Sequence, residues 1–428
     1  MADPIKLGIA GLGTVGVGLI KIIQNNAVLL TARAGRPIEI TAVSARSKTK
    51  NRDVDLSGYA WEDDAVNLAK RDDIDVFVEL IGGDAGPAKA ATEAAIAAGK
   101  HVVTANKAML ALHGQELAIA AEDADVNLRF EAAVAGGIPI IKALTESLAG
   151  NKIQRIMGVM NGTCNYILTR METVGLPYET VFEEANQLGY LEADPNLDVG
   201  GIDAAHKLVL LSAIAYGTQV DFDGAVLEGI GRITIEDIRA AADMGYRIKL
   251  LGVSQITDTG LSQSMRPCLV PVSSPLAQLD GGTNMVIVEG DAVGQIVLRG
   301  AGAGEGPTAS AVMGDVMDIA RGIKIPVFGQ PAKTLRAVAA ANTGAKNPYY
   351  LRLNLKDETG SMARISSALA DAGVSIDRMR QDGHEADAAP VLIVTHPTDR
   401  ETLNVALDGI QATGAVLQDP VALRIEVA

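Results

Sequence analysis

The residues of this sequence best suited to chemistry are Asp203 and Lys207, four positions apart in the apolar, helix-like stretch Ile202–Tyr216. Residues four apart lie on one face of a helix, so the carboxylate and the amine should be neighbours. Such a pair suits a substrate with an ammonium group and a hydroxyl group. Burial lowers the pKa of an amine, and a buried lysine can accept a hydroxyl proton. A surface ion pair has the same spacing, so the spacing alone leaves both interpretations open.

A second pattern is Gly11-Leu12-Gly13-Thr14-Val15-Gly16, which follows the apolar run Ile5–Ala10 and precedes a helical pattern over 17–23. Glycines at these spacings allow a tight turn, and they let backbone N–H groups approach a pyrophosphate at a helix N-terminus. The position between strand and helix therefore predicts that these six residues bind a dinucleotide. A glycine-rich turn without a cofactor is the alternative.

The end of the second predicted strand, 38–45, indicates which dinucleotide binds. An NAD site usually has Asp or Glu here, where it binds the ribose 2′-hydroxyl. This chain has Arg46 instead, followed by Lys48, Lys50 and Arg52. A cation suits a 2′-phosphate, so we expect NADP in preference to NAD, with Arg46 as the contact. The alternative is that Arg46 is only a solvated loop charge.

The elements that position these residues alternate between strand and helix up to residue 130. This order predicts an α/β fold: a Rossmann-type, doubly wound nucleotide-binding domain over residues 1–130. The predicted strands are Ile5–Ala10, 38–45, 75–80 and His101–Thr104, and the predicted helices are 17–23, 87–98 and 109–121.

Two further domains are predicted beyond residue 130. Helical patterns at 179–187, Ile202–Tyr216 and 234–244, with β-rich runs between 252 and 299, indicate an α+β substrate-binding and dimerisation domain with an open sheet over 131–304. We expect residues 305–338, with a helix at 308–321, to pack back on the first domain. After a linker at 339–348, residues 349–428 have the strand–helix–strand–strand–helix–strand order of a ferredoxin-like fold.

Composition and charge limit the partners and the compartment. The 37 basic and 52 acidic residues give a net charge of −15, which disfavours a nucleic-acid or anionic-membrane surface. The two cysteines, Cys164 and Cys268, cannot form a disulfide framework, which favours a reducing compartment. The N-terminal residues lack the pattern of a signal peptide, and no window has the roughly 18 uninterrupted apolar residues of a membrane helix. We therefore expect a cytoplasmic protein that acts on small molecules, without nucleic acid or membrane as a partner.

Five segments, in this order, resemble the homoserine dehydrogenase family. They are VVTANKA (102–108), EAAVAGGIP (131–139), NGTCNYIL (161–168), LGYLEADP (188–195) and GIDAAHKL (201–208). The resemblance implies an NAD(P)-dependent oxidoreductase that interconverts L-homoserine and L-aspartate 4-semialdehyde in threonine, methionine and isoleucine biosynthesis. It covers residues 5–330, and residues 349–428 resemble the ACT domain that many members carry.

The resemblance also implies roles for residues. Lys207 is then the acid–base group, Glu192 and Asp203 hold the substrate, and Lys107, Gly189 and Gly304 contact the cofactor. A monovalent-cation site of the family is resembled by four residues: Glu131 through its carboxylate, and Val134, Gly136 and Ile138 through their carbonyl groups. Hard oxygen ligands suit Na⁺, and a turn packed around a buried glutamate is the alternative.

The resemblance also leads to expectations for the assembly and the effector. We expect a homodimer or homotetramer, with L-threonine as the natural effector of the C-terminal domain. However, Thr359-Gly360 stands where ACT domains typically have Pro-Gly. A domain that serves only assembly is therefore the alternative.

Cys164 is the main departure from the family, which usually has Thr or Ser at this position. It introduces a rival class, the semialdehyde dehydrogenases that attack an aldehyde with a cysteine thiolate. The alternative is that Cys164 is a small buried thiol with no role in catalysis. A two-domain sugar dehydrogenase, which would use a histidine beside the lysine, and an amino-acid sensor with a vestigial dehydrogenase half are further alternatives. We expect His206 to be a packed or capping residue.

Overall fold

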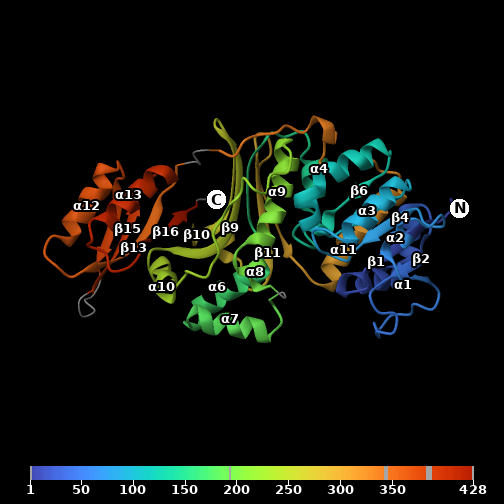
Figure 1. The fold of residues 1–428 in the computed structure, drawn as a ribbon, viewed down its shortest axis with the longest axis horizontal. Coiled ribbons are helices and arrows are strands. Elements are labelled where there is room, and N and C mark those ends of the chain that lie inside the picture. Colours follow the sequence, from blue (N-terminus) through green and yellow to red (C-terminus); the bar gives the residue numbers. More distant parts are fainter. Residues whose placement is uncertain (1, 192–193, 342–345, 382–387, 427–428) are drawn as a thin grey trace.

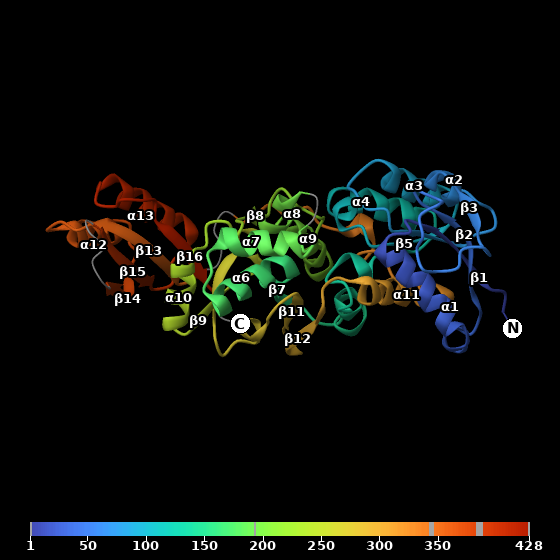
Figure 2. The ribbon, with the colours of Figure 1, turned by 90° about the horizontal axis from the view of Figure 1, so that it is seen from below.

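The structure is a computed structural model that describes residues 2–191, 194–341, 346–381 and 388–426. Three parts lie in a row: the N-terminal domain, a middle part built on a second sheet, and the C-terminal unit (Figures 1 and 2). The cavity that holds the candidate site lies between the first two parts, and a shared sheet, called the seam, joins the last two.

The N-terminal domain contains a six-stranded sheet whose strand pairs are all parallel, in the order β3-β2-β1-β4-β5-β6. The order reverses between β1 and β4, and ligands of open α/β sheets bind at the carboxyl ends of strands at such a switch point. The predicted Rossmann-type fold is therefore confirmed. The strands are β1 (Ile5–Ala10), β2 (Ile38–Ser44), β3 (Ala60–Glu62), β4 (Val76–Glu79), β5 (His101–Thr104) and β6 (Leu128–Arg129).

Helices cover both faces of this sheet (Figure 1). They are α1 (Thr14–Ala34), α2 (Ala65–Ala69), α3 (Pro87–Ala97), α4 (Lys107–Asp123) and, from much later in the chain, α11 (Glu305–Ala320). Helix α11 lies so close to α1 that a Cβ atom on Gly18 would come within 2.9 Å of the Glu305 carbonyl oxygen. Helix α11 therefore packs on the first domain.

Helix α1 is much longer than the pattern over 17–23 predicted. The apolar pattern breaks at Asn26, where the backbone leaves the helical region with φ −118° and ψ 19°, and the helix resumes beyond this kink. Among the helices in the described ranges, α1 is long and apolar enough, by length and composition alone, to cross a membrane. Leu19 and Ile20 of α1 are nevertheless fully buried in the core of the domain.

The middle part is built on the antiparallel strands β12-β11-β7-β9-β10. Its strands are β7 (Ile153–Val159), β8 (Val226–Leu227), β9 (Tyr246–Thr257), β10 (Gly260–Pro271), β11 (Thr283–Gly290) and β12 (Gly294–Ala301). Its helices are α5 (Ile140–Lys142), α6 (Gly162–Val174), α7 (Tyr178–Gln187), α8 (Pro195–Val199), α9 (Ile202–Tyr216) and α10 (Ile235–Asp243). Strand β7 was not predicted, although it leads directly into the candidate site.

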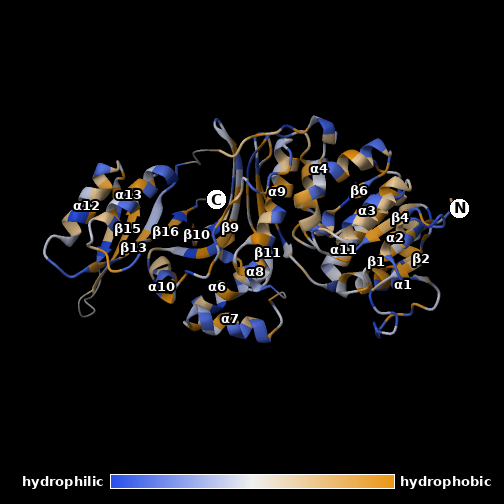
Figure 3. Cartoon of the chain, viewed as in Figure 1, coloured by the Kyte–Doolittle hydropathy of each residue, from blue (hydrophilic) through white to orange (hydrophobic). Residues whose placement is uncertain are grey.

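Hydropathy follows this layering (Figure 3). The strands of the N-terminal sheet are coloured mainly as hydrophobic, whereas α7, at the rim of the molecule, carries many hydrophilic residues. Helix α9 differs from α7 because most of its residues are buried, so it serves as a core helix of the middle part. Charged side chains on α9 must therefore be paired inside the protein.

The C-terminal unit has the predicted βαββαβ order, with the ferredoxin-like strand order β16-β13-β15-β14. It is not a free-standing tail. Strand β16 also pairs with β10, at Cys268 opposite Arg424 and Leu269 opposite Ile425, so one sheet runs through both parts. The elements are β13 (Tyr349–Lys356), α12 (Ser361–Asp371), β14 (Ile376–Gln381), β15 (Ala388–Thr395), α13 (Arg400–Ala412) and β16 (Val421–Ile425).

Candidate active site

A cavity of about 560 Å³ lies between the N-terminal domain and the middle part. Val15 of the glycine-rich loop and Lys107 of α4 line it from one side, and Asn161 and Lys207 line it from the other. It sits at the carboxyl ends of β1 and β5, which is where the fold places a dinucleotide and its substrate.

Helix α9 brings Asp203 and Lys207 to this cavity, as their spacing predicted. The Lys207 Nζ atom lies 2.7 Å from the Asp203 Oδ2 atom and donates a second hydrogen bond to the Met160 carbonyl oxygen, also at 2.7 Å. Both residues are 8% exposed, so the alternative of a surface ion pair is wrong. The Met160 carbonyl fixes the amine at the end of β7, where it faces the cavity.

A second lysine reaches the same carboxylate from the other domain. The Lys107 Nζ atom lies 2.8 Å from Asp203 Oδ1, so Asp203 stands between two ammonium groups. Burial by itself would raise the pKa of Asp203, but the charges of Lys207 and Lys107 outweigh it and hold that pKa well below its usual range. The carboxylate therefore stays ionised and holds the two lysines at the mouth of one cavity.

Asn161, Asp198 and Gly201, none of them predicted as site residues, complete this arrangement. Asn161 caps α6, and its amide nitrogen donates to Asp198 Oδ1 at 2.9 Å and to Asp203 Oδ2 at 3.4 Å. Gly201, in the left-handed region with φ 81°, lets the chain turn from α8 into α9. The sequence carried a signal for Asn161, since Asn before a helix is a common N-cap, but none that pointed to Asp198. Glu192, predicted to hold the substrate, lies outside the described residues.

The glycine-rich loop has the geometry that a pyrophosphate requires. Gly11 has φ 99°, and a Cβ atom there would come within 2.2 Å of the Leu80 carbonyl oxygen. A Cβ on Gly16 would come within 2.1 Å of the Gly11 carbonyl oxygen, whereas one on Gly13 would meet nothing within 4 Å. Gly11 and Gly16 thus permit the turn and the close packing, and Gly13 leaves open space over the N-terminus of α1. These residues fit a bound dinucleotide.

The loop after β2 is held in place by Arg52, one of the cations that follow the second predicted strand. Arg52 is 9% exposed, and it donates to the carbonyl oxygens of Leu12 at 3.1 Å, Lys50 at 2.8 Å and Ser47 at 2.5 Å. It thereby ties this loop to the glycine-rich loop. Arg46, the predicted 2′-phosphate contact, is exposed directly after β2.

Gly189 and Gly304, the other predicted cofactor contacts, also line the cavity. Both have positive φ, at 74° and 120°, so a side chain there would strain the backbone. Either glycine could thus serve the turn alone. The structure brings them together with Val15, Lys107 and Lys207 around one space.

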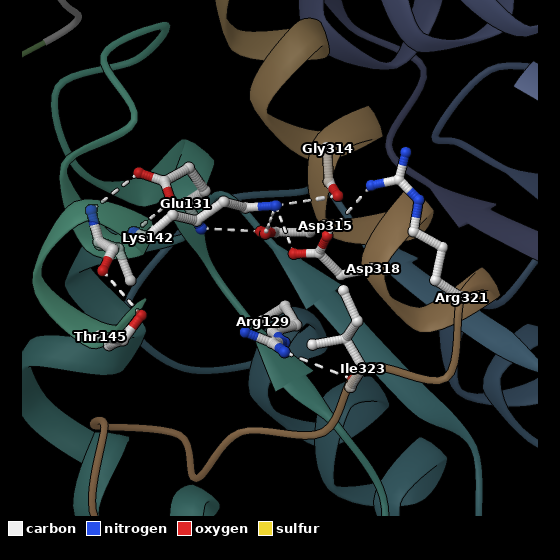
Figure 4. A network of polar contacts seen from close by, with 10 residues as sticks. Arg129, Glu131, Lys142, Thr145, Gly314, Asp315, Asp318, Arg321 and Ile323 are labelled. Atoms are coloured by element: carbon white, nitrogen blue, oxygen red, sulfur yellow. Dashed lines mark hydrogen bonds and ion pairs between the residues drawn. The ribbon is translucent and has the colours of Figure 1, made fainter. Parts of the chain in front are cut away.

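Glu131, the predicted cation ligand, lies in a separate buried network (Figure 4). Its carboxylate accepts hydrogen bonds from the backbone N–H groups of Ile141 at 2.9 Å and Lys142 at 2.8 Å. Burial, together with the charge of nearby Asp315, raises the pKa of Glu131 to about 8. The Ile138 carbonyl already accepts the N–H of Ile140 at 2.8 Å. Within the described ranges, no three acidic, His or Cys side chains gather as a metal site.

The environments of Cys164 and His206 do not favour the catalytic roles that the alternative classes would give them. Cys164 is fully buried, its Sγ donates to the Asp198 carbonyl oxygen at 3.2 Å, and burial raises the pKa of the thiol well above its usual value. Such a thiol stays protonated, which is the opposite of what a nucleophile needs. The His206 ring packs against Phe222 with ring centres 4.6 Å apart, and burial lowers its pKa. The expectation of a packed histidine is thus supported.

A Rossmann-type domain whose glycine-rich loop opens onto a cavity with a buried lysine–aspartate pair defines the class: a dinucleotide-dependent oxidoreductase. Family models refine this. Residues 11–131 match the model "Homoserine dehydrogenase, NAD binding domain", residues 139–317 match "Homoserine dehydrogenase", and residues 349–413 match "ACT domain".

Relatives agree over the whole length. Homoserine dehydrogenases from Neisseria gonorrhoeae and Pseudomonas aeruginosa are 43% and 41% identical to this chain, each over 99% of both chains. The crystal structure of a homoserine dehydrogenase from Thiobacillus denitrificans superimposes with a TM-score of 0.92 at 41% identity, covering 99% of this chain and 98% of that one. The chain belongs to the homoserine dehydrogenase family, and the comparisons favour neither the cysteine-dependent class nor a vestigial sensor.

Proposed function

We propose that the cavity binds L-homoserine or L-aspartate 4-semialdehyde beside a nicotinamide cofactor and that Lys207 is the acid–base group. The observation that carries this is the buried Lys207–Asp203–Lys107 arrangement facing the cavity, with contacts of 2.7 and 2.8 Å. A bound nicotinamide supplies the acceptor or donor of the hydride. In oxidation, C4 of homoserine gives up a hydride, its hydroxyl proton passes to neutral Lys207, and the C=O bond forms.

In reduction the same groups act in reverse. Protonated Lys207 gives its proton to the aldehyde oxygen as the hydride reaches C4. Asp203 keeps the lysine oriented, while the Met160 carbonyl holds the amine through the change of charge. Lys107, from the other domain, is the second cation near the reacting oxygen. Glu192 and Asp203 are the proposed contacts of the substrate, and Gly11 to Gly16, Lys107, Gly189 and Gly304 those of the cofactor.

We propose NADP as the preferred cofactor, with NAD as the alternative. Arg46 stands at the end of β2, and Lys48 and Lys50 follow it, so positive charge gathers where the 2′-phosphate of the adenosine would bind. A hyperthermophilic archaeal homoserine dehydrogenase solved in complex with NADPH is 27% identical to this chain, with a TM-score of 0.63. That complex supports the choice by analogy.

We propose that Glu131 and the carbonyl groups of Val134, Gly136 and Ile138 bind Na⁺. A buried carboxyl whose pKa is raised to about 8 is one that a nearby cation would keep ionised. We also propose a role in threonine and methionine biosynthesis in the cytoplasm, assembly as a homodimer or homotetramer, and L-threonine as an effector. The ACT match at residues 349–413 supports the last of these.

The purified chain tests the central proposal directly. We expect it to oxidise NADPH in the presence of L-aspartate 4-semialdehyde and to reduce NADP in the presence of L-homoserine, without any need for phosphate. A requirement for phosphate together with an acyl-enzyme would favour the cysteine-dependent class instead. No turnover in either direction would contradict the proposal.

A further inference from the structure

A buried amide on the wall of the active-site cavity lacks a partner inside the protein. Asn284 lies in β11, lines the cavity, and is only 1% exposed. Its Oδ1 atom has no hydrogen-bond partner among the described residues. A buried polar group that stays unpaired costs free energy, so this amide needs a partner from outside the chain. The proposed acid–base chemistry does not use it.

A glycine on the same wall makes room for the Asn284 side chain. A Cβ atom on Gly302 would come within 2.0 Å of the Asn284 Nδ2 atom and within 2.1 Å of its Cγ atom. Any other residue at position 302 would therefore displace the amide. Gly302 lines the cavity too. The backbone thus keeps a place for this amide at the cavity wall.

The strand that carries Asn284 is fixed in position. Strand β11 lies between β12 and β7 in the sheet. Just before β11, the buried Asn165 Nδ2 atom donates to the carbonyl oxygens of Leu279 at 3.2 Å and Gly281 at 2.7 Å. The buried Lys249 Nζ atom donates to Asn165 Oδ1 at 3.0 Å and holds that amide in turn. A recognition residue needs such rigid support.

The place of Asn284 in the cavity favours the cofactor as its ligand. Gly302 leads through Gly304 into α11, which packs on α1, the helix that follows the glycine-rich loop. This wall is continuous with the proposed cofactor contacts, whereas Lys207 and Asp203 belong to α9.

The chemistry of the amide favours one group of the cofactor. A nicotinamide carries a primary carboxamide, which offers an N–H donor and a C=O acceptor, as asparagine does. Two such amides can pair whichever way the Asn284 amide is turned. A carboxylate or an ammonium group would match only one of its two ends.

We propose that Asn284 binds the carboxamide of the nicotinamide. It is then a specificity-determining residue, which selects the cofactor by this group and takes no part in proton transfer. The inference rests on the proposed function, because it requires the cofactor to bind in this cavity.

Isothermal titration calorimetry on the full chain, without substrate, tests the proposal with NADP and its 3-acetylpyridine and thionicotinamide analogues. The first analogue lacks the N–H donor, and the second has sulfur, a weak acceptor, in place of the oxygen. We expect the unaltered chain to bind NADP about two- to tenfold more tightly than either analogue, which is the effect of one neutral hydrogen bond. In Asn284→Ala both preferences should disappear, because NADP loses affinity and the analogues lose less.

Two further variants make the result specific. Asn284→Asp keeps the size of the side chain and an acceptor but loses the amide donor. It should therefore keep the preference over the acetylpyridine analogue and lose the preference over the thionicotinamide analogue, and it serves as well if Asn284→Ala does not fold. Asn354→Ala is the matched control, since Asn354 lies in β13 and does not line the cavity. It should keep both preferences.

Unchanged preferences in Asn284→Ala and Asn284→Asp would overturn the proposal. An equal loss of affinity for NADP and both analogues would also overturn it, because Asn284 would then only support the cavity wall. So would a higher homoserine KM with unaltered binding of all three cofactors. If the unaltered chain bound NADP with both preferences but did not turn over homoserine, the proposed reaction would fail while this inference stood.

Discussion

The glycine-rich loop and the seam, where β16 pairs with β10, are stabilised in different ways. The loop is shaped by residues close together in the sequence, whereas the seam joins residues far apart in the sequence. The shape of the loop depends on Gly11 and Gly16 and follows from backbone sterics. The seam depends on buried ion pairs between remote residues. Arg155 of β7 lies 2.9 Å from Glu426, 271 positions away, and Arg352 of β13 lies 2.6 Å from Asp237, 115 positions away.

This difference predicts which substitutions alter activity and which alter the stability of the fold. The proposed acid–base group Lys207 on α9 should respond to substitution mainly with a change in rate, because Lys107 still pairs with the buried Asp203. The ion pairs at the seam should respond in the opposite way, because each partner is fixed by the fold and not by its neighbours in sequence. The following predictions test this contrast, from the largest expected effect to the smallest.

Lys207→Ala should lower kcat by about a hundred- to ten-thousandfold, the usual contribution of a general acid–base group, while the homoserine KM changes far less. Steady-state kinetics in both directions measure this. His206→Gln is the control: His206, the neighbour of Lys207 in sequence, packs against Phe222, so this variant should keep kcat within a few-fold. A higher KM with unchanged kcat in Lys207→Ala would show that Lys207 only binds substrate.

Arg352→Met should lower the free energy of unfolding by about 3 kcal/mol, because it leaves the buried carboxylate of Asp237 without its cation. Asp237 is fully buried, and the Tyr350 hydroxyl, at 3.2 Å, is a weaker substitute. Urea unfolding gives the value. Arg378→Met, in the exposed strand β14, is the control and should change stability little.

The same contrast bears on removal of the C-terminal unit. Truncation after Asn347 should leave a chain that still reduces the semialdehyde, because every proposed catalytic residue lies earlier in the chain, but one that unfolds more readily, because β10 loses β16. Equal stability of the truncated chain would contradict the importance given to the seam.

Glu131 should make stability fall as the pH rises. Its pKa in the folded protein is raised to about 8, above the ordinary value of 4.5, so the folded state holds its proton more tightly than the unfolded state. The stability that this group contributes is therefore highest below pH 4.5 and is lost as the pH rises to 8, by up to about 5 kcal/mol. Thermal unfolding in Na⁺-free buffer measures the slope. Glu131→Gln should flatten it, and added Na⁺ should offset it only if Na⁺ binds here.

Arg46→Asp should shift the ratio of NADP to NAD efficiencies about tenfold or more towards NAD, because an acceptor for ribose hydroxyls replaces the cation proposed to contact the 2′-phosphate. Fluorescence titration with NADPH and NADH gives the same ratio without turnover. An unchanged ratio would mean that Arg46 is only a solvated charge. Arg36→Asp, at a partly buried position just before β2, is a charge control.

Cys164→Ser should have the smallest effect, with most activity retained. The thiol is fully buried and donates to the Asp198 carbonyl, a role that a hydroxyl can fill. Loss of all activity in a variant that still folds, as judged by its thermal unfolding, would show that Cys164 takes part in the reaction.

The sequence alone determined the local features of this protein. The strand–glycine loop–helix order, the helix Ile202–Tyr216 with its paired Asp203 and Lys207, and the βαββαβ order of the C-terminal unit are all confirmed. These depend on hydrophobic periodicity and on backbone sterics, which act over a few residues and are therefore visible in a short stretch of sequence.

Only the tertiary structure decided which distant groups meet. It placed Lys107 on the second oxygen of Asp203, set Asn161 between the carboxylates of Asp198 and Asp203, and joined β16 to β10. It also showed that Arg52 fixes the loop beside Arg46. No periodicity encodes such contacts, because a buried charge can find its partner anywhere in the chain, and the requirement to pair it is met only when the whole fold has formed.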